Sequence, residues 1–105
     1  MKKVFAAKDI KSNCFLPPVT DENAVTFSRG IAASLRKYPE SPLASFPQDF
    51  QLYELAQFNE QTGEFEPNVQ PRLICDLNSL LSVEQKNALD SKMKGGLHAK
   101  QESLV

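Results

Sequence analysis

The clearest pattern of apolar and polar positions lies between residues 20 and 39. Apolar side chains recur there at steps of three, four, four and three residues: Ala24, Phe27, Ile31, Leu35 and Tyr38. This spacing places them on one face of an α-helix, with Thr20 or Asp21 as the expected N-cap. Pro39 lacks a backbone N–H, so the helix is predicted to end near Lys37 or Tyr38.

Shorter stretches alternate between apolar and polar residues and predict β-strands. Residues 3–8 (KVFAAK) form the first, and residues 14–16 (CFL) form a second that ends at two prolines. Residues 50–58 (FQLYELAQF) form a third. The polar turn that follows, NEQTG, contains a glycine where a positive φ is needed, so residues 64–66 are expected to return as the partner of a hairpin.

The last third of the chain gives weaker signals. Pro67 and Pro71 are expected to bracket a loop, after which residues 72–77 predict another strand. Ser82 and Gln85 form a potential capping box for a marginal helix over residues 83–94, closed by two glycines. Residues 97–105 are predicted to be disordered.

Residues 41–55 (SPLASFPQDFQLYEL) connect the helix to the third strand. Their Ser-Pro and Phe-Pro pairs are expected to hold the chain extended. Phe46 and Phe50 are expected to fill the gap between helix and sheet. The segment is therefore interpreted as a structural joint, not as a catalytic loop.

Together these elements predict an α+β fold: a small, mostly antiparallel sheet of three to five strands with one amphipathic helix packed on one face. Residues 1–80 are expected to form the single domain, and residues 81–105 a marginal helix and flexible tail. Such a sheet leaves an edge and part of a face uncovered, which predicts a homodimer.

The composition is ordinary for a globular protein, with 41% hydrophobic and 24% charged residues. No apolar run is long enough for a membrane span, so no membrane association is expected. The net charge is −1, but its distribution is uneven. Residues 1–37 carry seven basic and three acidic groups, whereas residues 38–76 carry one basic and seven acidic groups. This asymmetry indicates a partner for the basic side or head-to-tail self-association, and a solvated mixed surface explains it equally well.

No catalytic motif is present, and the chain is not expected to be an enzyme or to bind a cofactor or metal. His98 is the only histidine and has no ligand at metal-binding spacing. Cys14 and Cys75 are expected to be reduced cysteines in or near the core. Three glutamates, Glu54, Glu64 and Glu66, would meet across the hairpin, but an acidic solvated face explains them better than a metal site does.

A single-strand nucleic-acid binder needs positive charges together with exposed rings on which bases stack. The chain offers both, with Phe5, Phe15 and Tyr53 in predicted strands. The candidate nucleic-acid-binding residues are Lys2, Lys3, Lys8, Lys11, Arg29, Arg36, Lys37 and Tyr53. Core packing accounts equally well for the rings, so the residues alone leave a protein-interaction module open.

The order of three segments, KVFAAKDIKSNCFLPP, NAVTFSRGIAASL and SPLASFPQDFQLYELAQFNEQTGEFEP, resembles the small non-structural protein encoded by the fifth open reading frame of gokushoviruses. These are single-stranded DNA phages of the Microviridae. The likeness covers roughly residues 2–67. It implies a DNA-binding accessory of phage replication or packaging that acts in the host cytoplasm, with single-stranded DNA and a viral or host replication protein as partners. The tail departs from the pattern and contains four further lysines: Lys86, Lys92, Lys94 and Lys100.

Overall fold

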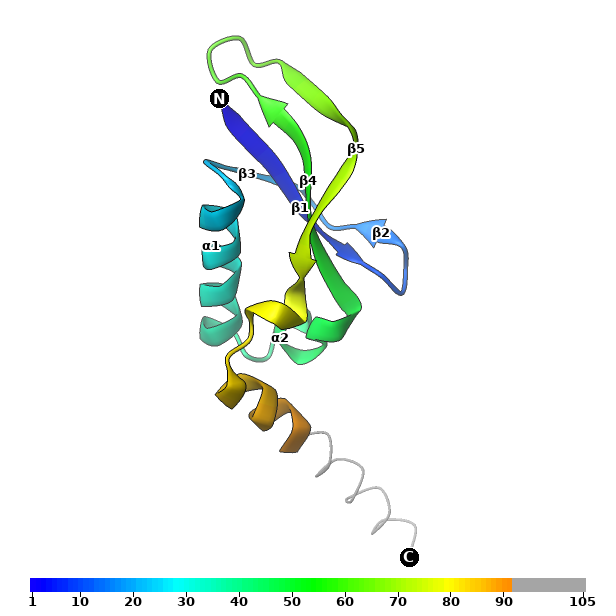
Figure 1. Ribbon diagram of the computed structural model, residues 1–105, viewed down its shortest axis with the longest axis vertical. Helices are drawn as coiled ribbons and strands as arrows, with labels where there is room; N and C mark the ends of the chain where they lie inside the picture. The colour runs from blue at the N-terminus through cyan, green and yellow to red at the C-terminus, as the bar shows by residue number, and fades with distance from the viewer. Residues whose placement is uncertain (92–105) are drawn as a thin grey trace, which may run out of the picture.

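The computed structural model describes residues 1–91 (Figure 1). Within them, five antiparallel strands form one sheet in the order β2-β1-β4-β5, and β3 pairs with the same edge of β1 as β2. The α+β fold predicted from the sequence is confirmed. The elements are β1 (Lys2–Asp9), β2 (Cys14–Phe15), β3 (Val19–Asp21), α1 (Ala24–Lys37), α2 (Pro42–Ser45), η1 (Pro47–Asp49), β4 (Phe50–Phe58), β5 (Phe65–Asp76) and η2 (Leu77–Leu80).

β1 is the central strand, with β4 on one side and β2 and β3 on the other. Its middle four residues, Val4 to Ala7, are all buried. Side chains alternate between the two faces of a strand, so β1 is covered on both sides at this point. Phe5 and Ala7 belong to the main core, together with Leu52 of β4.

α1 lies against one face of the sheet, which we call the helix-covered face (Figure 1). The ring of Phe27 stacks on that of Phe5, with centroids 4.6 Å apart and planes within 8° of parallel. The helix begins later than predicted, because β3, which the sequence did not reveal, uses Thr20 and Asp21 to pair with β1. Asn23 is the N-cap instead, and its Oδ1 accepts a hydrogen bond of 2.8 Å from the Thr26 N–H.

The joint between helix and sheet is helical, and the prediction that its proline pairs hold it extended was wrong. α2 begins at Pro42 and η1 at Pro47, both at the first helical position, where a missing N–H costs nothing. Ser41 caps α2, with its Oγ accepting from the Ala44 N–H. Phe50 fills the core as expected, but Phe46 is 55% exposed, and Pro47 is fully buried in its place.

β4 and β5 form a hairpin that is longer than predicted. Gly63 has φ +76° in its turn, as the sequence indicated. The predicted return strand, the loop and the following strand are one continuous strand, β5. Irregularities in the β4–β5 register accommodate Pro67 and Pro71, since β5 is an edge strand and its outer side has no ladder to maintain.

The chain after β5 returns to the core. Leu77 of η2 and Leu81 are buried there. The predicted capping box is confirmed: the Gln85 N–H donates to Ser82 Oγ at 3.1 Å, and the Ser82 N–H donates to Gln85 Oε1 at 2.9 Å. Residues 83–91 are helical. Residues 92–94 of the predicted helix, His98 and the segment predicted to be disordered lie outside the described residues.

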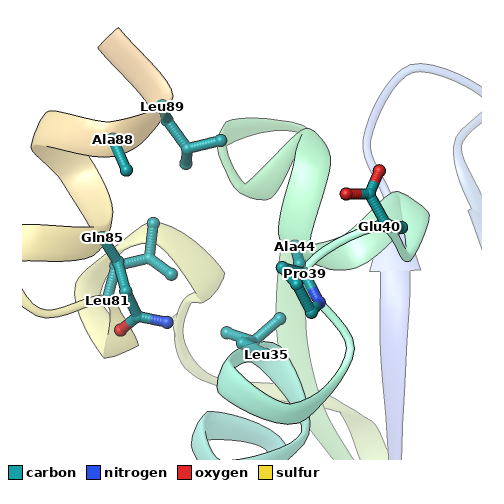
Figure 2. A pocket seen from close by; sticks show the side chains of 8 residues that line it. All are labelled: Leu35, Pro39, Glu40, Ala44, Leu81, Gln85, Ala88 and Leu89. Atoms are coloured by element: carbon teal, nitrogen blue, oxygen red, sulfur yellow. The ribbon is translucent and has the colours of Figure 1, made fainter. Parts of the chain in front are cut away.

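A pocket of about 150 Å³ lies between the end of α1, α2 and the helix over residues 83–91 (Figure 2). Leu35, Leu81 and Leu89 extend into it, and Glu40 and Gln85 are its polar residues (Figure 2). Its lining is otherwise apolar. The pocket therefore offers packing surface and no arrangement of acid, base and nucleophile.

The two cysteines are free but differ in environment. Cys75 packs against the core on the helix-covered face, where burial raises the pKa of its thiol. Cys14 is exposed on β2, so the prediction that both lie in or near the core was wrong for this one. It pairs with Asp9 at the end of β1, where no helix covers the strand.

Candidate nucleic-acid interface

Three of the predicted DNA-contacting lysines are engaged by carboxylates. Lys2 pairs with Glu22, at the link between β3 and α1. The Nζ of Lys3 lies 3.3 Å from Glu54 Oε1, and the Nζ of Lys11 lies 3.5 Å from an oxygen of Asp49. A phosphate would have to compete with these partners, so the three lysines do not form a ready anion-binding track.

The other predicted cations are divided between two surfaces. Arg29, Arg36 and Lys37 are exposed on α1, and within residues 1–91 no carboxylate pairs with them. Lys37 lies beside the ring of Tyr38, 5.4 Å from its centroid. Lys8, in contrast, alternates with Ala7 in β1 and therefore points away from the helix. The predicted set is thus not one continuous groove.

Lys8 is the centre of a cluster on the face of the sheet opposite to α1, which we call the open face. Its Nζ lies 5.4 Å from the ring centroid of Phe15 and 5.9 Å from that of Tyr53. The two rings meet edge to face, with centroids 5.4 Å apart and planes at 80°. We call Lys8, Phe15 and Tyr53 the cation–aromatic cluster. It combines a positive charge with two rings, as stacking of single-stranded bases requires.

The strand register explains why these three side chains meet. Lys8 is the pairing partner of Phe15 in β2 and of Gln51 in β4, and Tyr53 lies two residues beyond Gln51 on the same face. The Tyr53 hydroxyl donates to Gln51 Oε1 at 3.0 Å, and Gln51 Nε2 donates to Asp76 Oδ1 at 2.9 Å. This chain of hydrogen bonds fixes the orientation of the Tyr53 ring.

The predicted nucleic-acid-binding set contains Lys8 and Tyr53 but not Phe15, the third member of the cluster. Phe15 is 39% exposed, whereas Phe5, which was considered as a stacking ring, is fully buried against Phe27. Both lie in strands with similar apolar neighbours. The only sequence signal that separates them is the position of Phe15 in a two-residue edge strand between polar turn residues and prolines, where little can cover it.

Glu54 is the buried carboxylate of the sheet, 6% exposed, on the helix-covered face opposite Phe5 in the register. Burial raises its pKa, but the hydrogen bond from the Asn68 side chain and the contact with Lys3 outweigh it, so the pKa of Glu54 lies below its usual value. Asn68 Nδ2 also donates to the Glu54 carbonyl. Glu54 is therefore held as an ion by structural partners.

The alternative of a metal held by hairpin glutamates has no geometric support in the described part of the chain. Glu54 is occupied by Lys3 and Asn68, while Glu64 and Glu66 are exposed near the hairpin turn. Within residues 1–91, no three His, Cys, Asp or Glu side chains gather closely enough to hold a metal ion.

No helix in residues 1–91 is a candidate for crossing a membrane. α1 has 14 residues and carries Arg29, Arg36 and Lys37, so it is both too short and too polar. None of the helices described in residues 1–91 combines the length and the apolar character of a membrane span.

Comparison with curated proteins and with solved structures finds no match to this chain. Comparison with protein families finds a match. The matched residues, 2–80, include every strand of the sheet, α1 and the cation–aromatic cluster. Since the match covers most of the chain, the protein belongs to the family described as phage ORF5 protein.

Proposed function

We propose that this phage protein binds single-stranded DNA without sequence preference and thereby assists replication or packaging of a single-stranded DNA genome in the host cytoplasm. The observation that supports the proposal is the cation–aromatic cluster on the open face, with Lys8 beside the rings of Phe15 and Tyr53. The resemblance to the gokushovirus non-structural proteins agrees with this assignment, and a single-stranded genome provides the ligand.

The cluster suits an unpaired base better than a duplex. A base in single-stranded DNA exposes its flat face, and each base stacked on an aromatic ring contributes roughly 1–3 kcal/mol to binding. Phe15 and Tyr53 meet edge to face, so one of the two rings can present its face to a base while the other supports it. Lys8 is then placed to contact the adjoining phosphate.

The absence of sequence preference follows from the same chemistry. All four bases have a face on which to stack, and Lys8 interacts with phosphate as a point charge. The polar groups next to the cluster, Gln51 and Asp76, are already hydrogen-bonded to each other. They are therefore poorly placed to read a base edge. Arg29, Arg36 and Lys37 on α1 would add charge-dependent attraction from a second surface.

Fluorescence anisotropy with a labelled oligothymidylate tests the proposal. Affinity is expected to fall as salt rises, because phosphate contacts release counterions. Tyr53→Leu keeps an apolar side chain but removes the ring, and it is expected to weaken binding by roughly tenfold. The matched control is Phe46→Leu, at an exposed ring outside the cluster. Undetectable binding at low salt, or equal losses in both variants, would contradict the proposal.

A protein-interaction role is the second candidate, favoured by a different observation. β5 exposes apolar side chains at alternate positions, and the neighbouring hairpin turn is acidic. Such a surface suits a viral or host replication protein, or a capsid-assembly protein. A pull-down from infected cells, compared with and without nuclease, separates the two roles: a partner that survives nuclease supports this one, and recovery of nothing but DNA-dependent partners counts against it.

A further inference from the structure

The outward side of β5 carries an apolar pattern that a solvent-facing strand does not need. From Phe65 to Leu73, the odd-numbered residues of the strand are all apolar, and all are exposed: Phe65, Pro67, Val69, Pro71 and Leu73. We call these five residues the β5 stripe. The even-numbered residues between them are polar. An antiparallel sheet with one solvated face normally shows the reverse, with polar residues outward.

The stripe belongs to the open face. Leu73 is the register partner of Tyr53, and the ring of Phe65 lies 4.8 Å from that of Phe58. Asn68 points the other way, since its side chain donates to Glu54 on the helix-covered face. Val69, the next residue, is fully exposed, while Phe65 is 62% and Leu73 50% exposed. The register gives Val69 and Pro71 no partner in β4, and all five side chains of the stripe are exposed among the described residues.

The stripe is nearly symmetric about Val69. Reading outward in either direction gives a proline at the second position and a large apolar residue at the fourth. A two-fold interface requires a patch of this kind, in which residue i meets residue j and j meets i.

We propose that the β5 stripe is the interface of a homodimer in which two copies pack antiparallel with Val69 on the two-fold axis. Phe65 of each copy then lies level with Leu73 of the other. Pro67 and Pro71 lack the N–H that an added strand would need, so the contact is made by side chains and not by a continuous sheet.

The arrangement is compatible with the rest of the molecule. α1 covers the opposite face and does not obstruct the approach of a second copy (Figure 1). Lys8 and Phe15 lie across the sheet, because β1 and β4 separate β2 from β5. Tyr53, however, is the register partner of Leu73 and adjoins the stripe. The dimer interface therefore borders the proposed DNA site, but the dimer does not depend on the DNA-binding proposal.

Sedimentation velocity over a wide concentration range tests the dimer. The protein is expected to self-associate, and Val69→Glu is expected to weaken association by about 100-fold or more, since each dimer would bury two carboxylates. The matched control is Gln70→Glu, which adds the same charge one residue away on the other face and is expected to leave the dimer intact. Circular dichroism confirms folding of both variants.

A cross-link tests the position of the axis. In a Cys14→Ser, Cys75→Ser background, Val69→Cys places two equivalent thiols next to each other, and mild oxidation is expected to give a covalent dimer. Gln70→Cys is expected to give little. A monomer at all concentrations, a dimer that Val69→Glu leaves unchanged, or equal cross-linking at both positions would overturn the proposal. DNA binding by the monomeric Val69→Glu variant would leave the proposed function intact.

Discussion

The two faces of the sheet are built from the same strands but have opposite relations to the rest of the chain. The helix-covered face is closed by α1, η2 and Leu81, and its buried carboxylate, Glu54, is satisfied by Lys3 and Asn68. Within residues 1–91, no helix packs on the open face. Its outward side chains are rings and aliphatic groups with Lys8 at one side. One face of the sheet therefore supplies stability, while the other carries the exposed surface that a partner could contact.

The largest effect is expected from a cavity on the helix-covered face. Phe5→Ala removes a fully buried ring that stacks on Phe27, which should cost about 3–5 kcal/mol of the free energy of unfolding. Urea denaturation measures this value. The control on the open face is Phe65→Ala, at a ring that is mostly exposed, and its loss should be much smaller. Equal losses at the two positions would mean that the faces do not differ as described.

Removal of a polar side chain from the helix-covered face should have an intermediate effect on the free energy of unfolding. Asn68→Ala leaves the buried Glu54 with Lys3 as its remaining partner and is expected to cost about 1–3 kcal/mol. The neighbouring Gln70→Ala removes an exposed amide and should stay within about 0.5 kcal/mol of the parent. A loss at Asn68 no larger than at Gln70 would show that the contact with Lys3 alone satisfies the carboxylate.

The pH dependence of the free energy of unfolding should reflect the ionisation of Glu54. The pKa of Glu54 is lowered in the folded protein, so its contribution is complete above its ordinary value of 4.5 and is lost as pH falls through the folded value. Protonation therefore favours the unfolded chain. Urea midpoints measured between about pH 6 and about pH 3 should fall less steeply for Glu54→Gln than for the parent. Parallel curves would contradict the assignment.

Substitution of Lys8 is expected to have the smallest effect on stability. Its effect on DNA binding should nevertheless be clear. Lys8→Gln on the open face should change the free energy of unfolding by less than about 0.5 kcal/mol. It should weaken DNA binding and reduce the salt dependence by about 0.7 in slope, the value for one phosphate contact to a single strand. Lys86→Gln, at an exposed lysine beyond the family match, is the control. An unchanged slope for Lys8→Gln would remove this residue from the DNA site.

Local signals predicted the elements whose neighbours in the chain determine them. The spacing of Phe27, Ile31 and Leu35 predicted α1, and the reciprocal Ser82 and Gln85 signature predicted a cap that the structure forms. The hairpin turn followed from Gly63. In each case the stabilising contact lies within about one helical turn or one tight turn.

The errors share a different cause. β3 is three residues long, with two of them exposed, and exists because β1 offers a free edge; no local pattern marks it. The prolines of β5 indicated a loop, but an edge strand tolerates them when its register shifts. The prolines of residues 41–49 indicated extended chain, although proline also begins helices. Long-range pairing resolved each ambiguity.

The sequence by itself determined the fold class, the amphipathic helix and the hairpin, because periodicity and turn chemistry act over a few residues. It also provided the rings and the lysines. Only the tertiary structure decided which of them meet. Strand register brings Lys8, Phe15 and Tyr53 together on the open face and places Phe5 in the core. The fold also pairs three lysines with carboxylates: Lys2, Lys3 and Lys11. Register depends on contacts between residues far apart in the chain, and a one-residue shift would exchange the two faces.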